Sequence, residues 1–193
     1  MLASDPLYIR PEDYLAGELA SPIKHEYRDG EVFAMSGGTQ NHATIMLNLA
    51  TALKLHLRGS GCRPFAENMK VQVRAAKAYY YPDIAVTCDE RDRQPEQHFI
   101  EHPCLIIEVL SPSTAKFDRD LKFADYRTLD SLAEYVLVSS DRREVEVFRR
   151  NESGCWTQQG YRSGEDEEVR LASVDFAIGL REVYEDTPLY EGL

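Results

Sequence analysis

The sequence predicts one α/β (α+β) domain, in which helices flank a mixed central β-sheet, with an N-terminal β-hairpin. Short β-prone runs recur along the chain, and residues 41–58 have the apolar spacing of a helix. Asp29-Gly30 between two β-prone stretches marks a two-residue hairpin turn. No repeat or linker divides the 193 residues, so we expect a single domain over 1–193, with a loose leader at 1–10.

The composition is that of an ordered but acidic chain. Hydrophobic residues make up 43% of the sequence, and the formal net charge is −11. That charge argues against a general polyanion-binding surface, because duplex binding relies on basic side chains that neutralise phosphates. No apolar run approaches the ~20 residues of a membrane span, and we expect no membrane partner. None of the four cysteines forms a CxxC pair, which argues against a thiolate zinc site. Three of them lie in apolar or strand-like surroundings, and we expect free thiols in a reduced, cytoplasmic protein.

The first half predicts two helices, the hairpin and two long strands. Residues 11–19 predict a short helix with Pro11 in its first turn. Residues 41–58 predict the clearest helix, on an apolar stripe of Met46, Leu49, Ala50, Leu53 and Leu57. Residues 62–74 alternate loosely and predict one half-exposed strand, and residues 79–88 predict the next.

The second half predicts a loop, a central strand, a helix and further strands. Residues 89–103 are polar and predict a surface loop, whereas 104–110 predicts a strand buried on both faces. A helix from Thr114 to about Leu129 follows, with Ser113 as its cap and an apolar stripe of Phe117, Leu121 and Ala124. The remaining expected elements are strands at 134–139, at 144–148 and around Trp156, an acidic loop at 164–169 and a short helix at 179–185.

Two acids stand out beside these strands. Glu108 lies among aliphatic residues, and desolvating an unpaired carboxylate costs several kcal/mol, on the order of the stability of a domain. It must therefore be protonated, paired with a base or bound to a cation. Asp83 lies on the 79–88 run, and the two acids can meet if their strands pair. Two such carboxylates suit Mg²⁺, which can bring in a phosphodiester and activate a water.

The same acids also have ordinary structural interpretations. Asp83 can be a strand-edge acid that follows a proline. Glu108 can be the buried half of an ion pair, with Arg63, Arg74 or Lys122 as its partner. Buried acids with shifted pKa values occur both at functional sites and in structural pairs, so the residues alone leave both interpretations open.

Six stretches, in their order and spacing, carry a resemblance to a known family: HEYRDGEVFAMSG, NHATIMLNL, YPDIAV, LIIEVLSPST, DRDLKFADYR and EYVLV with VEVFRR. Together they resemble the Uma-type family of restriction endonuclease-like proteins, within the PD-(D/E)XK nuclease superfamily, over nearly the whole chain. The resemblance implies a mixed sheet flanked by helices and metal-dependent cleavage of phosphodiesters. It also implies that Asp83, in the Pro82-Asp83 signature, and Glu108 are metal ligands.

The expected lysine departs from the superfamily pattern. Leu110 stands two residues after the second acid, and the resemblance assigns the lysine's role to Lys122 in the next helix. Helical spacing places Lys122 about 100° from Leu121, on a flank of the apolar stripe. It also aligns Asp118, Lys122 and Tyr126 at i, i+4 and i+8 as candidate supporting residues. Alternatively, Lys122 is a surface lysine that pairs with Asp118.

Glu26 and His42 match two further recurrent positions of the family. The resemblance implies that Glu26 is a third acid near the metal. His42, at a helix N-terminus, is a candidate contact for a phosphate or a water. The residues alone favour a solvated hairpin side chain for Glu26 and a structural role for His42.

These observations together predict a Mg²⁺-dependent endodeoxyribonuclease, with Mn²⁺ as an alternative metal, DNA as its substrate and a homodimer as a candidate assembly. Asp83 and Glu108 would hold the metal, and Lys122 would position the attacking water or stabilise developing charge. One alternative is a catalytically inactive nucleic-acid-binding or regulatory module on the same fold, which the net charge favours. Another is a hydrolase of small phosphoesters.

Overall fold

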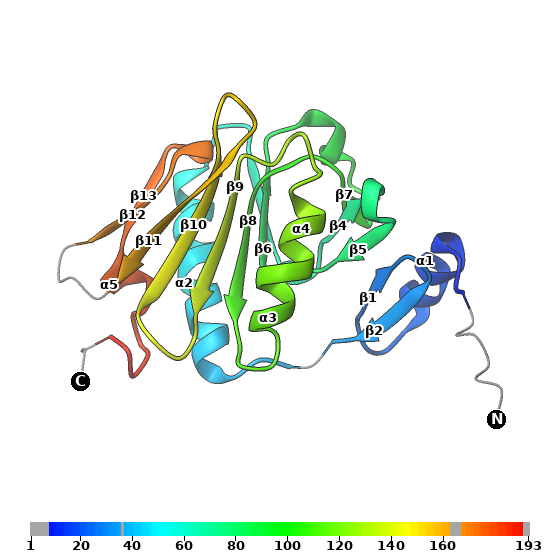
Figure 1. Ribbon diagram of the computed structural model, residues 1–193, viewed down its shortest axis with the longest axis horizontal. Helices are drawn as coiled ribbons and strands as arrows, with labels where there is room; N and C mark the ends of the chain where they lie inside the picture. Colours follow the sequence, from blue (N-terminus) through cyan, green and yellow to red (C-terminus); the bar gives the residue numbers. More distant parts are fainter. Residues whose placement is uncertain (1–7, 36, 163–166, 191–193) are drawn as a thin grey trace.

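The computed structural model describes residues 8–35, 37–162 and 167–190, which form two larger sheets and one small sheet with helices packed around them (Figure 1). The six-stranded sheet has the order β11-β10-β9-β8-β6-β3. Strands β8 and β9 are parallel and the other neighbours are antiparallel, so the predicted mixed sheet is confirmed. Its strands are β3 (Arg63–Ala66), β6 (Ile84–Thr87), β8 (Pro103–Leu110), β9 (Glu134–Ser139), β10 (Glu144–Arg150) and β11 (Trp156–Arg162).

A five-stranded sheet stands beside the first, in the order β2-β1-β5-β4-β7. Its strands are β1 (His25–Arg28), β2 (Glu31–Ala34), β4 (Lys70–Val73), β5 (Ala78–Tyr80) and β7 (Phe99–Ile100). The small sheet is a ribbon of β12 (Glu168–Leu171) and β13 (Phe176–Gly179). The expected acidic loop lies partly at 163–166, outside the described residues, and its end at Glu168 and Val169 belongs to β12.

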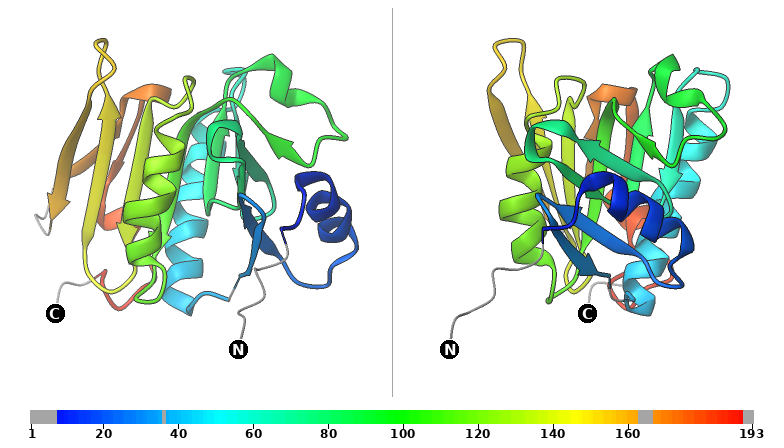
Figure 2. Two further views of the ribbon diagram at one scale, coloured as in Figure 1. Left: turned by 45° about the vertical axis from the view of Figure 1, so that its right-hand side comes forward. Right: turned by 90° about the vertical axis from the view of Figure 1, so that its right-hand side faces the viewer.

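Helices cover both faces of the six-stranded sheet, as the right-hand view in Figure 2 shows. One face packs on α2 (Gln40–His56), α5 (Leu180–Val183) and the β12–β13 ribbon. The other face packs on a continuous helical segment, residues 115–126, made of α3 (Ala115–Phe117), the π-helical turn η3 (Asp118–Lys122) and α4 (Phe123–Tyr126). The remaining helices are α1 (Pro11–Ala20) and the 3₁₀ turns η1 (Arg74–Ala76), η2 (Glu90–Arg93) and η4 (Ala172–Val174). Within the described ranges, no helix combines the length and apolarity that crossing a bilayer requires.

The alternation of side chains along β8 decides which way Glu108 points. Leu105, Ile107 and Val109 belong to the core under α2, whereas Ile106 and Leu110 belong to the core under the segment 115–126. Because successive strand residues face opposite sides, Glu108 shares the second face and points at that helical segment. The run is buried on both faces, as predicted, and the sheet places its one acid against a helix.

Two predicted strands are wrong in their extent, because the chain changes sheets within each. The expected strand 62–74 is divided into β3 and β4, and the expected strand 79–88 into β5 and β6. The first break lies at Glu67, whose φ is 54°, and the second at Pro82, which has no amide hydrogen to continue a ladder. The expected surface loop 89–103 also contributes η2 and the short strand β7.

Residues 8–35, called the N-terminal arm below, carry α1 and the β1–β2 hairpin at one end of the molecule (Figure 2). Asp29 and Gly30 both have positive φ, 43° and 95°, which confirms the predicted turn. Tyr14 stacks on Tyr27 with ring centroids 5.0 Å apart, and the two form a small core together with Tyr79 of β5. The amide of Ile9 donates to Gly30 O at 3.0 Å, so the end of the expected leader contacts the hairpin, and residues 1–7 lie outside the described residues.

One disulfide corrects the expectation of free thiols. Cys62 and Cys88 are bonded, while Cys104 and Cys155 are free thiols. The cause is strand register: Arg63 pairs with Thr87 in the β3–β6 ladder, so Cys62 and Cys88 occupy the next pair of opposed positions. Cysteine spacing alone does not contain this register, because it depends on how β3 pairs.

Candidate active site

The β6–β8 ladder brings Asp83 and Glu108 opposite each other. Ile84 pairs with Ile107, so the next step of the same antiparallel register joins Asp83 to Glu108. The amide of Asp83 donates to Glu108 Oε2 at 3.3 Å, and the amide of Val109 donates to Asp83 Oδ2 at 2.7 Å. Both carboxylates therefore line one cleft, as expected if their strands were adjacent.

Lys122 reaches the same place because of the π-helical turn. Regular helical spacing put Lys122 on a flank and predicted that Phe117, Leu121 and Ala124 would face inward. Instead Ala124 is exposed, and Asp118 and Lys122 are buried. A π turn contains an extra residue, and one residue corresponds to about 100° of rotation, which moves this face toward the sheet. The segment also begins at Ala115 rather than at a cap on Ser113.

Three carboxylates surround the Lys122 ammonium. Its Nζ lies 2.9 Å from Glu26 Oε1, 3.2 Å from Glu108 Oε1 and 3.3 Å from Asp118 Oδ1. The interpretation of Lys122 as a surface residue is therefore wrong, although its pairing with Asp118 is present. Glu26 is only 7% exposed and accepts from the amide of Tyr81 at 3.0 Å, so the solvated-hairpin interpretation is also wrong.

The charges of this cluster do not balance. Burial raises the pKa of Glu108 well above its usual value, and the neighbouring Asp118, Asp83 and Glu26 raise it further, against the attraction of Lys122. Burial also raises the pKa of Glu26. Burial alone would lower the pKa of Lys122, but Glu108, Glu26 and Asp118 outweigh it and raise that pKa well above the usual value. Lys122 therefore stays protonated. Its single positive charge cannot neutralise the four carboxylates of Glu26, Asp83, Glu108 and Asp118.

His42 approaches the cluster from the start of α2. The side chain of Thr39 caps the helix by accepting from the amide of His42 at 3.3 Å. His42 Nε2 lies 3.3 Å from Asp83 Oδ2, and this contact raises the pKa of the imidazole. Gly38 lies so close that a Cβ there would be 2.8 Å from His42 Nδ1. His42 thus contacts one of the two acids, and its contact with a phosphate or a water stays a prediction.

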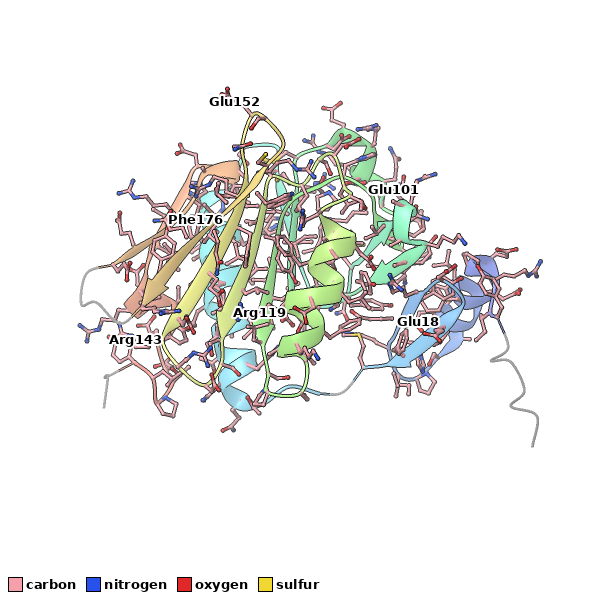
Figure 3. All side chains as sticks on the ribbon, in the orientation of Figure 1. Glu18, Glu101, Arg119, Arg143, Glu152 and Phe176 are labelled. Atoms are coloured by element: carbon pink, nitrogen blue, oxygen red, sulfur yellow. A yellow bond between two sulfur atoms is a disulfide. The ribbon has the colours of Figure 1, made fainter. Side chains whose placement is uncertain are left out.

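Tyr126 is near the cluster but outside the cleft. It packs against Tyr80 and Tyr135, with ring centroids 5.5 and 5.6 Å away, and burial raises its pKa well above the usual value. Among the described residues, its hydroxyl has no hydrogen-bond partner. Arg119, from the same helical segment (Figure 3), extends instead to Glu146 of β10, with Nη1 2.7 Å from Oε2.

A cleft of about 460 Å³, called the acid cleft below, lies between the cluster around Lys122 and the N-terminal arm. Asp83, Glu108, Asp118, Lys122 and His42 line it together with Glu67, and the arm contributes Pro22, Ile23, Lys24 and Met35. Sequence reasoning missed Glu67 and Lys24. The positive φ of Glu67 and the docking of the arm have no local sequence signal. The one clue was that Lys24 lies next to the hairpin that carries Glu26.

The donor set of the cleft suits a hard divalent cation in part. Within the described ranges, no three His, Cys, Asp or Glu side chains gather closely enough to complete a ligand set alone. Mg²⁺, however, is often held by one or two carboxylates, with waters and substrate phosphates as its other ligands. Both contacts of the Asp83 carboxylate go to Oδ2, and Glu108 lies opposite, so these two acids fit such a partial set.

The fold is that of a restriction endonuclease-like nuclease. A crystal structure described as "a putative nuclease belonging to DUF820" from Anabaena variabilis ATCC 29413 matches with a TM-score of 0.74, covering 91% of this chain and 97% of that one. The two sequences are 16% identical, so this likeness concerns the fold. Residues 11–181 match the Uma2 family, described as "Putative restriction endonuclease". The chain belongs to this family, which confirms the resemblance seen in its motifs.

Two relatives from Synechocystis sp. (strain ATCC 27184 / PCC 6803 / Kazusa) are similar over most of their length. One, "Uncharacterized protein slr1290", is 40% identical over 170 residues, which are 88% of this chain and 89% of the relative. The other, "Uncharacterized protein sll1609", is 30% identical over 157 residues, 81% of this chain and 89% of the relative. The family match over residues 11–181 spans the strands of the six-stranded sheet and the residues that line the acid cleft.

Proposed function

We propose that this protein is a Mg²⁺-dependent endonuclease that hydrolyses DNA phosphodiester bonds in the acid cleft. The observation that carries the proposal is the opposition of Asp83 and Glu108 across the β6–β8 ladder, beside a lysine that is held by three carboxylates. Burial, and after it the neighbouring acids, raise the pKa of Glu108, and a divalent cation between Asp83 and Glu108 would favour its ionised form.

Each residue has a distinct task in this proposal. When bound, Mg²⁺ would neutralise phosphate charge and make a water more acidic. Asp83 and Glu108 would hold it. Lys122 would hold the attacking water or stabilise the charge that develops on the phosphate, because Glu26 and Asp118 fix its ammonium next to Glu108. His42 supports Asp83 through its contact with Oδ2.

Incubation of the purified protein with supercoiled DNA, in Mg²⁺ or Mn²⁺ and in chelator, tests the proposal. We expect nicked and linear products in the presence of metal, and their loss in Asp83→Ala, Glu108→Ala and Lys122→Ala. Circular dichroism of each variant checks that the fold is retained. Lys116→Ala, which removes an exposed lysine from the same helical segment, is the matched control and should cleave normally. Cleavage by all three site variants at the wild-type rate would reject the assignment.

A non-catalytic nucleic-acid-binding or regulatory module is the second candidate. One observation favours it: the Lys122 ammonium is already surrounded by carboxylates, and His42 occupies one oxygen of Asp83. In such a cluster Lys122 and His42 already have carboxylate partners without a bound metal ion. Calorimetric titration with Mg²⁺ and Mn²⁺ separates the two candidates. Heat that depends on Asp83 and Glu108 supports the nuclease, and no binding at millimolar concentrations supports the module.

A further inference from the structure

The acid cleft has a second wall of different chemistry, formed by the N-terminal arm. Met35 donates its amide to Lys24 O at 2.9 Å, which extends the β1–β2 ladder by one step beyond the pair of His25 and Ala34. Side chains alternate along a strand, so Lys24 and Met35 share the hairpin face of Glu26. Glu26 contacts Lys122, and this face of the arm is therefore turned toward the catalytic acids.

Lys24 is the cation of the cleft that a phosphate can most easily reach. Of the described residues that line the cleft, the basic ones are Lys24, His42 and Lys122. Lys122 is engaged by three carboxylates and His42 by Asp83. Lys24 Nζ instead donates to the backbone oxygen of Glu67 at 3.3 Å and lies 5.8 Å from the centre of the Tyr81 ring. A phosphate can approach it without displacing a carboxylate.

Beside Lys24 the same wall is apolar and open to solvent. Ile23 is 55% exposed and Met35 is 37% exposed, and both line the cleft with Pro22. Exposed apolar side chains rimmed by polar groups mark grooves that bind a ligand with an apolar surface. The faces of unpaired bases are such a surface, whereas bases in a duplex are stacked and expose only their edges.

The size and charge of the cleft also favour one strand over two. Its volume of about 460 Å³ lies within the ~300–1,000 Å³ range of pockets that enclose a small organic ligand, and a double helix is far wider. Duplex binding further requires many phosphate contacts from basic side chains. The net charge of −11 and the few cations among the described lining residues do not provide them.

We propose that the acid cleft takes single-stranded DNA, with a backbone phosphate at Lys24 and an unpaired base against Ile23 and Met35. The cleavage experiment below rests on the proposed nuclease function, whereas the binding experiment tests the inference independently of it. It makes Lys24 a substrate-positioning residue, and it predicts that single strands, or single-stranded segments of a larger DNA, are the preferred substrates.

The cleavage experiment compares the rates at which one labelled oligonucleotide is cut in Mg²⁺, either single-stranded or annealed to its complement. We expect the single strand to be cut at least about tenfold faster, which corresponds to ~1.4 kcal/mol of preference. Lys24→Ala should raise KM with little change in kcat, because a contact made equally in the ground and transition states affects KM alone. Lys24→Arg should return KM to the wild-type value. Lys54→Ala, from an exposed lysine on α2, is the matched control.

The binding experiment measures the fluorescence anisotropy of the same oligonucleotides in chelator at low ionic strength, and again in Mg²⁺. We expect tighter binding of the single strand, weakened about fivefold or more by Ile23→Ser and by Met35→Ser, since each substitution removes apolar surface that an unpaired base would cover. Leu47→Ser is the control, because Leu47 is 61% exposed on α2 but does not line the cleft.

The outcomes separate this inference from the proposed function. Equal cleavage and equal binding of single strand and duplex, or variants at Lys24, Ile23 and Met35 that match their controls, would overturn the inference and leave the nuclease intact. Lys24-dependent binding of the single strand without cleavage of any DNA would uphold the inference and reject the nuclease. Absence of detectable single-strand binding, both in chelator and in Mg²⁺, would overturn the inference as well.

Discussion

Lys122 Nζ lies 3.2 Å from Glu108 Oε1, and both side chains are almost entirely buried. The alternation along β8 turns Glu108 toward the helical segment 115–126, and the π-helical turn in that segment turns Lys122 toward the sheet. Because Lys122 also serves Glu26 and Asp118, the single ammonium neutralises Glu108 incompletely. The stability of the metal-free protein and its response to pH should therefore depend on these two side chains.

Glu108→Gln should make the metal-free protein more stable at neutral pH. Burial raises the folded-state pKa of Glu108. A group with a raised folded pKa contributes its full stability below its unfolded pKa, near ~4.3, and loses that stability as pH rises through the folded value. Glutamine removes this loss, so the gain should appear at neutral pH and vanish below about pH 4.

Thermal unfolding in chelator across this pH range measures the effect. Glu152→Gln is the control, because Glu152 lies on the exposed turn between β10 and β11 (Figure 3) and should leave the curve unchanged. A wild-type protein that is more stable than Glu108→Gln at neutral pH would show that the ion pair with Lys122 outweighs the cost of burying the carboxylate.

Lys122→Met should have the opposite effect. Removing one partner of a buried ion pair leaves an uncompensated charge and typically costs ~3–5 kcal/mol. Here Glu26, Glu108 and Asp118 would lose the same cation, so the cost should lie in the upper part of that range. Denaturant unfolding measures it. Lys116→Met, an exposed lysine in the same segment, should stay within about 0.5 kcal/mol of wild type.

The double variant Lys122→Met/Glu26→Gln isolates the electrostatic part of this effect. Glu26→Gln keeps an acceptor for the Tyr81 amide while removing one of the unpaired charges. It should recover part of the lost stability without restoring cleavage. No recovery would mean that Lys122 stabilises the fold through packing of its aliphatic chain rather than through its charge.

Much of this arrangement follows from local sequence. The hydrophobic run around Glu108 and the turn at Asp29-Gly30 each act through their nearest neighbours, and each predicted its element. The pairing of the two acid-bearing strands followed from their order along the chain, because sequential strands tend to be neighbours. These features placed Asp83 and Glu108 correctly before any tertiary contact was known.

The remaining features depend on contacts that sequence spacing does not encode. The chain leaves one sheet for the other at Glu67 and at Pro82, within two stretches that the sequence predicts as single strands. The π turn shifts Lys122 by a rotation that ideal helical spacing cannot include. Glu26 and Lys24 enter the site only because the arm docks against it, through the ion pair of Arg28 with Asp125 at 2.8 Å among other contacts. Glu18 of α1 (Figure 3) also holds the arm, by accepting from the Tyr81 hydroxyl at 3.1 Å.

Gly38→Ala should lower cleavage while leaving the fold intact. A Cβ at Gly38 would lie 2.8 Å from His42 Nδ1, so the imidazole would have to move and would lose its 3.3 Å contact with Asp83 Oδ2. Displacements of this size next to a reacting centre commonly reduce rates about ten- to a hundredfold. Gly37→Ala is a matched control from the same loop, because a Cβ there meets no atom within 4 Å.

Initial rates of plasmid nicking in Mg²⁺ measure this difference, with thermal unfolding to check stability. Wild-type rates for both Gly38→Ala and Gly37→Ala would remove His42 from the catalytic arrangement. Equal loss in both variants would indicate instead that the loop itself must remain free of side chains for DNA to enter the cleft.

The disulfide between Cys62 and Cys88 should stabilise the pairing of β3 with β6, the strand that Asp83 precedes. The bond closes a chain segment with a sequence separation of 26 residues, and loops of this order gain ~3–4 kcal/mol from the restricted unfolded chain. A reductant should therefore lower the unfolding temperature of the wild type and leave that of Cys62→Ala/Cys88→Ala unchanged. Cys155→Ala, at an exposed free cysteine, should respond to reductant as the wild type does. Peptide mapping without reductant should find Cys62 linked to Cys88, and free thiols at both positions in the folded protein would contradict the bond.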